Sequence, residues 1–168
     1  MAMGVWSRDM LRPLGIDMPL VAERGYHLEF PDPGVRLENS VMDADAKIAC
    51  SSMEGGLRMA GQAEFGAIDA PPDPRVHKRM LGIAREIFPG MSAEQPRLWM
   101  GRRPTLPDGL AAIGPVPGHE GLYAAFGHSH TGLMMAPKTG EVIAELMQGK
   151  APNANLSAFA PLRFSSRG

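Results

Sequence analysis

The sequence has little cysteine and no long apolar run, and each shortage excludes a class of protein. Cys50 is the only cysteine among 168 residues, so the chain can form neither a disulfide framework nor a cysteine metal site, and a reducing compartment fits best. No apolar run approaches the length of a membrane-spanning helix, and the first residues lack the basic and apolar regions of a secretory signal. We therefore expect a soluble cytoplasmic location.

An excess of basic charge is also missing. The 17 Lys and Arg residues are balanced by 18 Asp and Glu, which gives a formal net charge of -1 and no support for a nucleic-acid surface. Hydrophobic residues make up 44% of the chain, enough for a core, while 16 Pro and 20 Gly predict many turns. The length suits one domain, or one domain with an appended element.

Short extended runs separated by turns dominate the first part of the chain. After a short helix at residues 7–14, stopped by Gly15, we expect strands at residues 19–30, 35–42, 47–53 and 57–65. In the first of these strands Tyr26, Leu28 and Phe30 share one face at period two. Tight turns between successive strands, such as Glu54-Gly55-Gly56, favour an antiparallel sheet.

Two helices stand out in the second part. Apolar residues recur at helical spacing between residues 76 and 87, with Asp73 as N-cap and Pro74 just inside the helix. The chain is then expected to be extended over residues 97–114, with turns at Pro104 and at residues 107–109. A strand at residues 121–126 and a helix at residues 136–147 follow. The predicted class is α+β, with a mostly antiparallel sheet and flanking helices.

A glycine-rich turn, residues 127–132, connects the last strand to the last helix. A helix N-terminus presents unpaired N–H groups and the positive end of the helix dipole, which suit a phosphate, a carboxylate or an electron-rich ring edge. The spacing matches neither the phosphate loop nor the G-x-G-x-x-G fingerprint. The alternative is a tight loop that needs glycine dihedrals.

His128 and His130 lie two residues apart in this turn. They would share a face in an extended segment, so a metal pair is conceivable. A zinc site needs one or two further ligands. His119 is the nearest remaining histidine, and no Glu or Asp lies at a recognisable ligand spacing. We therefore predict no metal site and interpret the two histidines as pocket-lining or solvated residues.

Arginine side chains are the other candidate binding groups. The planar fork of Arg103 suits a carboxylate because it donates two parallel hydrogen bonds. The alternative is a solvated face, and on a strand only one of Arg102 and Arg103 can point into a pocket. Arg58 alternates with apolar neighbours and raises the same question, while Tyr26 is either a pocket residue or a core-edge residue.

Several segments together resemble the C-terminal part of the D-amino-acid oxidase-like FAD oxidoreductases, especially the D-amino-acid dehydrogenase and glycine oxidase branch. The resemblance covers nearly the whole chain, and its two C-terminal segments are the strongest. The segments are G-V-W-S (residues 4–7), E-R-G-Y-H (23–27), M-E-G-G-L-R-M-A-G-Q-A-E-F (53–65), G-R-R-P-T-L-P-D-G with I-G-P (101–109 and 113–115), and G-H-S-H-T-G-L-M-M-A-P with T-G (127–137 and 139–140). Arg102 departs from the pattern, since relatives usually carry an apolar residue there.

The resemblance implies roles for named residues. Arg103 would bind a substrate carboxylate, and His130, Tyr26 and Arg58 are further substrate-pocket candidates. The turn and helix start would run beside the isoalloxazine of FAD, where N–H groups and the helix dipole stabilise negative charge. The residues expected there are Gly127, His128, Thr131, Gly132, Leu133 and Met134.

The implied reaction is hydride transfer from the α-carbon of a D-amino acid or related amine to FAD. The product is an imino acid, which hydrolyses to a keto acid and ammonia. No protein base is demanded where the substrate amine is already neutral, so no catalytic residue is predicted.

One family element has no counterpart in the sequence. The N-terminal Rossmann-type half, with its G-x-G-x-x-G strand and acidic ribose ligand, is not found. We therefore expect a chain that binds FAD weakly or not at all by itself, self-associates through exposed apolar surface, and needs an FAD-binding half or a complementary subunit as partner. Peripheral membrane association of the parent protein stays open.

The sequence also suggests a division of roles along the chain. Residues 1–125 would form the substrate-binding sheet region, and residues 126–168 the flavin-contacting turn, helix and tail. The alternative to a part of a flavin enzyme is a non-catalytic binding module that reuses the same fold.

Overall fold

The structure, a computed structural model, describes residues 1–164, which fold as two compact units. The sheet unit comprises residues 24–101, and the hairpin unit comprises residues 1–23 with residues 102 onward. Both boundaries fall inside strands, namely β1 (Val21–Phe30) and β5 (Arg97–Thr105). These units differ from the predicted division of the chain at residue 125. That division separates substrate-binding from flavin-contacting residues and remains a proposal.

The sheet has five strands in the order β2-β3-β4-β1-β5. The strands β2 (Val41–Asp43), β3 (Ile48–Met53) and β4 (Gly56–Gly66) form an antiparallel meander. In its register Met53 pairs with Gly56, which leaves Glu54 and Gly55 as a two-residue turn. The predicted antiparallel pairing is confirmed for these strands, and the predicted turn is confirmed except that Gly56 already belongs to β4.

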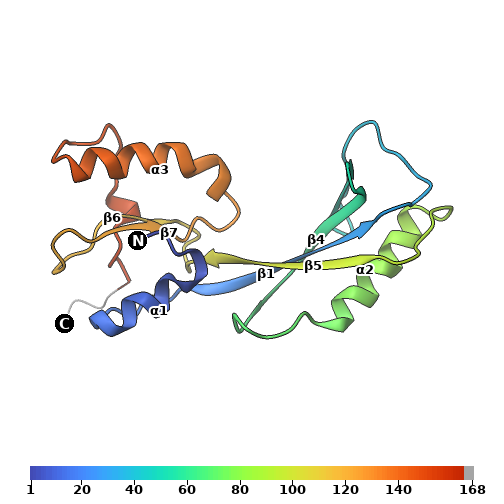
Figure 1. The fold of residues 1–168 in the computed structure, drawn as a ribbon, viewed down its shortest axis with the longest axis horizontal. Helices are drawn as coiled ribbons and strands as arrows, with labels where there is room; N and C mark the ends of the chain where they lie inside the picture. Colours follow the sequence, from blue (N-terminus) through green and yellow to red (C-terminus); the bar gives the residue numbers. More distant parts are fainter. Residues whose placement is uncertain (165–168) are drawn as a thin grey trace. The chain divides into compact units, whose positions relative to one another are not determined.

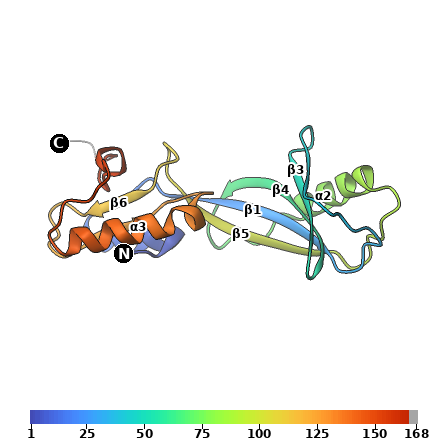
Figure 2. The same cartoon turned by 90° about the horizontal axis from the view of Figure 1, so that it is seen from above.

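One face of this sheet carries the core of the sheet unit. The alternating residues Tyr26, Leu28 and Phe30 are buried there, as the period-two pattern predicts. Met80 and Ala84 on α2 (Pro74–Ile87) pack into the same cluster, and Figures 1 and 2 show α2 beside the sheet. Because β1 is central, between β4 and β5, most of its length is buried.

The start of α2 follows from its local sequence. The Asp73 carboxylate accepts a hydrogen bond of 2.8 Å from the backbone N–H of Arg75, and Pro74 occupies the first helical position, where a missing N–H does no harm. The predicted cap is therefore confirmed. The Arg75 guanidinium also bonds to this carboxylate, and these hydrogen bonds hold the pKa of Asp73 below its usual range.

The hairpin unit is built from short elements around β6 (Ala112–Pro115) and β7 (Tyr123–Phe126). These two strands pair antiparallel, with Ala112 opposite Phe126. The helix α3 (Gly132–Met147) lies across the hairpin and contributes Val142 to a cluster with Ile113 (Figure 1). Short helical turns complete the unit: η1 (Gly4–Trp6), α1 (Ser7–Leu11), η2 (Arg12–Leu14) and η3 (Ser157–Phe159).

Three sequence predictions were wrong in detail. Strand structure begins at Val41 rather than at residue 35, since residues 35–40 make no ladder and the Leu37 N–H donates to the Ser52 hydroxyl instead. Pro104 does not turn the chain but lies within β5, an edge strand, where a residue without an N–H is tolerated. The last helix begins at Gly132, four residues before the predicted start, so Pro137 lies inside it.

Within residues 1–164, no helix is both long and apolar enough to cross a membrane.

Candidate functional site

A polar cluster of the hairpin unit surrounds the carboxylate of Glu23. Its Oε1 lies 2.6 Å from Nε2 of His130 and 3.3 Å from Nη1 of Arg103. Its Oε2 lies 3.1 Å from the Thr105 hydroxyl. The side chain of Glu23 is 12% exposed, whereas those of Arg103 and His130 are 36% and 59% exposed. A nearly buried carboxylate thus holds two more exposed groups that a ligand can reach.

Strand periodicity explains which residues of β5 join this cluster. Arg103 and Thr105 are two residues apart, so their side chains leave the same face of the strand, and both reach Glu23. The same alternation directs Arg102 to the opposite face. The arginine that the resemblance assigns to a substrate carboxylate is therefore the one in the cluster.

The loop between β7 and α3 brings the histidine. His128 forms an isolated antiparallel bridge with Thr105, and the Ser129 N–H donates to the Pro104 carbonyl at 3.0 Å. Ser129 has a φ of 48°, in the left-handed region that non-glycine residues seldom adopt. Such strain persists only where surrounding contacts enforce it, and the Ser129 hydroxyl lies 3.1 Å from that of Thr105.

Gly127 is the first residue of this loop, and its position requires glycine. Its φ is 83°, and a Cβ at this position would lie 2.9 Å from the Leu106 side chain. Leu106 is buried in the core of the hairpin unit with Phe126. Gly127 therefore serves the local backbone geometry, whether or not a ligand lies beside it.

The N-terminus of α3 is the place where the sequence predicts unpaired N–H groups. Thr131, at the N-cap, makes no side-chain cap bond, because its hydroxyl donates to the His128 carbonyl at 2.9 Å. The first backbone N–H groups of the helix, from Gly132 to Met134, are therefore not capped by that side chain. Leu133 and Met134 are 92% and 77% exposed, so two apolar side chains stand beside these donors.

His128 points toward α3 rather than toward Glu23. Its Nε2 lies 3.0 Å from the Thr139 hydroxyl, and burial lowers the pKa of its imidazole, which favours the neutral ring at pH 7. Both residues line a pocket of about 350 Å³ whose other walls are small or apolar. These walls are Ala2, Ala125, Gly132, Ala136, Gly140 and Ile143. The two neighbouring histidines thus have different surroundings and do not share a partner.

Tyr26, a predicted pocket residue, is engaged within the sheet unit. Its hydroxyl donates to Glu64 at 2.6 Å and accepts from Arg24 and from the Asp73 N–H, each at 3.1 Å. The side chain is buried. These contacts engage the hydroxyl of Tyr26 within the sheet unit, and its substrate-binding role stays a prediction.

Arg58 lies on β4 in the sheet unit, half-buried. Its Nε is buried and makes no hydrogen bond within the described residues. Burial lowers the pKa of His27, and the positive charge of Arg58 lowers it further. The His27 ring stacks on Trp99 with centroids 4.7 Å apart, while Trp99 remains 54% exposed. A substrate-binding role for Arg58 stays a prediction.

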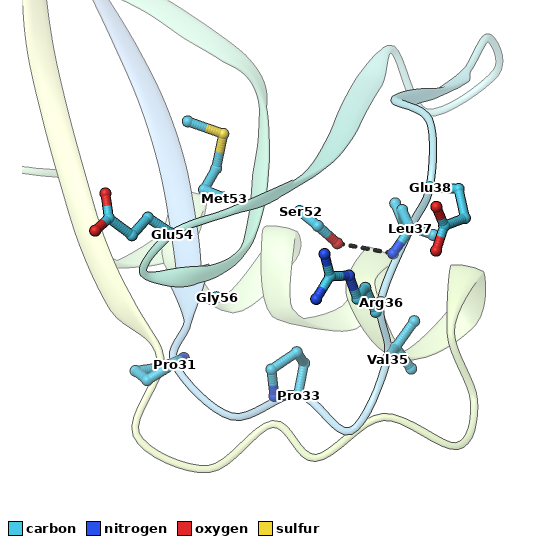
Figure 3. A pocket seen from close by; sticks show the side chains of 10 residues that line it. All are labelled: Pro31, Pro33, Val35, Arg36, Leu37, Glu38, Ser52, Met53, Glu54 and Gly56. Carbon is cyan, nitrogen blue, oxygen red and sulfur yellow. Dashed lines mark hydrogen bonds between the residues drawn. The ribbon is translucent and has the colours of Figure 1, made fainter.

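A separate hollow of about 630 Å³ lies in the sheet unit, beside the turn between β3 and β4 (Figure 3). Ser52 and Leu37 close one side of it through a 2.7 Å hydrogen bond, and Arg36 extends toward Ser52. Carboxylates of Glu38 and Glu54 also line it. None of the predicted site residues lies there, and its mixed charges single out no ligand.

The structure assembles only part of the predicted site into one cluster. Arg103 and His130 meet at Glu23. Of the six predicted flavin-contacting residues, Gly127 and His128 lie in the loop before α3, Thr131 is the N-cap, and Gly132, Leu133 and Met134 begin the helix. Sequence reasoning missed Glu23 and Thr105 as members of a site. No sequence signal singled out Glu23, because β1 also carries Arg24, His27 and Glu29. Within residues 1–164 no group of three or more His, Cys, Asp or Glu side chains is placed to hold a metal ion.

Comparison with known proteins identifies the architecture. Residues 1–146 match the DAO family model, described as FAD dependent oxidoreductase. The chain is 34% identical over 167 residues to a D-amino-acid oxidase of Bradyrhizobium diazoefficiens and 32% identical over 162 residues to a glycine oxidase of Pseudomonas aeruginosa. These alignments cover 97% and 96% of the chain but 40% and 44% of the two relatives.

Solved structures show the same fold. Glycine oxidase from Geobacillus kaustophilus superposes with a TM-score of 0.77 at 24% identity, and iminodiacetate oxidase from Chelativorans sp. with 0.75 at 23% identity. Each match covers 95% of this chain and 44% of the solved chain. The mixed α/β fold with its antiparallel sheet is therefore shared with these proteins.

Proposed function

Because the chain belongs to the DAO family of FAD dependent oxidoreductases, we propose that it forms part of an enzyme that oxidises the C–N bond of a D-amino acid or a related amine. The chain spans less than half the length of the curated relatives that it matches. The proposal therefore concerns the protein that contains this chain. We assign substrate contact to Arg103 and His130, and flavin contact to the turn and helix start at residues 127–134.

The observation that carries the proposal is the cluster around Glu23. One guanidinium N–H of Arg103 engages Glu23 at 3.3 Å, and its other N–H groups have no partner among residues 1–164. A guanidinium fork with free donors is suited to a carboxylate, which it binds through two parallel hydrogen bonds. In an amino acid held in this way, the nitrogen is attached to the carbon next to the carboxylate, so it stays close to the guanidinium and to the side chains around Glu23.

The residues at the start of α3 fit a flavin. The uncapped N–H groups from Gly132 to Met134 and the positive end of a 16-residue helix suit an electron-rich ring edge. The exposed side chains of Leu133 and Met134 offer apolar contact to a ring, and the neutral His128 adds no charge. When bound, FAD would supply the acceptor for the hydride that leaves the substrate α-carbon.

Flavin reduction by an amine tests this proposal. The protein that contains this chain would be purified with added FAD and mixed anaerobically with D-amino acids, glycine and secondary amines in turn. We expect bleaching of the visible flavin absorbance by at least one of them, with release of the corresponding keto acid and ammonia. An FAD-replete protein that none of these compounds bleaches would overturn the proposed activity.

A further inference from the structure

We propose that Glu23 and His130 form a carboxylate–imidazole pair that removes the proton from the ammonium group of the substrate. This inference rests on the proposed function and adds a proton acceptor to a site for which the sequence demanded none. An amine gives up hydride from its α-carbon only when the lone pair of its nitrogen is free. A substrate that arrives as an ammonium ion must therefore lose one proton first.

The contact with Glu23 fixes which nitrogen of His130 can accept. A carboxylate only accepts hydrogen bonds, so at 2.6 Å from Oε1 the Nε2 of His130 must carry the hydrogen. In the neutral ring the lone pair then lies on Nδ1. Nδ1 has no hydrogen-bond partner among residues 1–164, and the side chain is 59% exposed. The acceptor nitrogen is thus free and accessible to a ligand.

Glu23 itself is poorly suited to meet the substrate. Its side chain is 12% exposed, and both of its oxygens are already engaged, Oε1 by Arg103 and His130 and Oε2 by Thr105. Its geometry is that of a positioning residue, which orients an imidazole and stabilises the imidazolium formed when that ring takes a proton. His130 is the group of the pair that touches the substrate.

Arg103 brings the substrate nitrogen to this acceptor. Nη1 of Arg103 and Nε2 of His130 both contact Oε1 of Glu23, so the ends of the two side chains lie on either side of this one oxygen. In an α-amino acid the nitrogen and the carboxylate are attached to the same carbon. With the substrate carboxylate on the free N–H groups of Arg103, the proposal places the ammonium group, on the adjacent carbon, beside Nδ1 of His130.

The proton transfer balances without any further reagent. One N–H bond of the ammonium group breaks, an N–H bond forms at Nδ1, and the electron pair stays on the substrate nitrogen. The positive charge moves to the imidazole, where the Glu23 carboxylate faces it. Arg103, the other charged group at this carboxylate, opposes the new charge, but the substrate carboxylate lies on its guanidinium and offsets that opposition.

The first test determines the tautomer of His130 in the full chain. Long-range proton–nitrogen NMR correlations distinguish a protonated Nε2 from a protonated Nδ1. We expect the Nε2–H form in the unmodified protein and a loss of that preference in Glu23→Gln, whose amide can also donate. A protonated Nδ1 in the neutral unmodified ring would overturn the proposal, and this measurement requires neither a variant nor a substrate.

The second test uses the FAD-loaded protein and the rate of flavin reduction at several pH values. His130→Gln should slow reduction about 10²-fold or more at pH 7. The rate should recover above the pKa of the substrate ammonium group, where no acceptor is needed. The same substitution at His119, in the turn that joins β6 to β7, should leave the rate unchanged.

The outcomes separate this inference from the proposed function. If His130→Gln reduces its flavin equally slowly at every pH, or as fast as the unmodified protein at pH 7, the proton-acceptor role is contradicted. Neither result contradicts the proposed function. If no amine reduces the flavin of the unmodified protein, the proposed function fails, and the tautomer measurement alone then decides whether the pair exists.

Discussion

The hydroxyl of Thr139 lies 3.0 Å from Nε2 of His128, which ties the second turn of α3 to the loop that precedes the helix. Thr139 is buried and His128 is partly buried, and this burial lowers the pKa of the imidazole. In the unfolded chain the same ring titrates near its ordinary pKa of about 6.5. The folded protein therefore holds this histidine neutral at pH values where the unfolded chain protonates it.

This relationship predicts a loss of stability in mild acid. The stabilisation is fully present above pH about 6.5 and is lost as the pH falls from there through the lowered folded pKa, because the unfolded chain binds more protons. His27, whose pKa is also lowered by burial, acts in the same direction. The urea concentration at the unfolding midpoint should be lower at pH 5.5 than at pH 7.5, and this difference should be smaller in His128→Gln. An identical difference in the variant would contradict the assignment.

Arg103 should dominate substrate affinity if the proposed function holds. Removal of a charge-paired carboxylate contact in Arg103→Ala should weaken substrate binding by about 2–5 kcal/mol, and Arg103→Lys should recover only part of it because an ammonium lacks the fork. The measurement is a titration of the flavin spectrum under conditions that prevent turnover. Arg102→Ala, on the opposite face of β5, is the matched control, and the reverse ranking would assign the carboxylate to Arg102.

The sequence predicted the elements whose signals are local. The two residues Asp73 and Pro74 are sufficient to predict the start of α2. The Glu54-Gly55 turn is equally local, because it lies between two strands with alternating side chains. The errors occurred where tertiary context overrides local preference. Pro104 indicates a turn in isolation, but it is tolerated in β5 because that strand lies at the edge of the sheet.

The centre of the site was not predictable in the same way. Glu23 meets Arg103 across 80 positions of sequence and His130 across 107, so no spacing rule connects them. The resemblance named Arg103 and His130 individually, whereas their common contact with one carboxylate is a property of the fold. The residue that joins two predicted site residues is thus the one that pattern reasoning passes over.

An ion pair should stabilise the end of the described chain. The Arg163 guanidinium donates to both oxygens of Asp108, at 2.7 and 2.8 Å, and to the carbonyls of Leu110, Ala111 and Ala160. Arg163 is 13% exposed and Asp108 33%, so solvent screens the pair only in part. We expect Arg163→Ala to lower the free energy of unfolding by about 1–3 kcal/mol.

Acid should remove the same stabilisation. The hydrogen bonds from Arg163 hold the pKa of Asp108 below its usual range, so the contribution is present at neutral pH, declines once the pH falls below the ordinary aspartate value of about 4, and is gone below the lowered pKa. Urea unfolding at pH 7 and at pH 3 measures this difference. The gap between Arg163→Ala and the unmodified protein should narrow at pH 3, and an equal gap at both pH values would show that the lost carbonyl contacts account for it.

Two adjacent glycines, Gly55 in the turn between β3 and β4 and Gly56 at the start of β4, should differ sharply in their tolerance of a methyl group. Gly56 has a φ of +119°, and a Cβ there would lie 2.1 Å from the carbonyl oxygen of Phe30, a backbone atom of β1 that cannot move aside freely. Gly55 has no heavy atom within 4 Å of an added Cβ. Gly56→Ala should therefore destabilise the protein by about 2–4 kcal/mol, whereas Gly55→Ala should change its stability by about 0.5 kcal/mol or less. Denaturant unfolding of the two variants measures this contrast, and equal midpoints would show that β1 and the turn are not packed as closely as the structure places them.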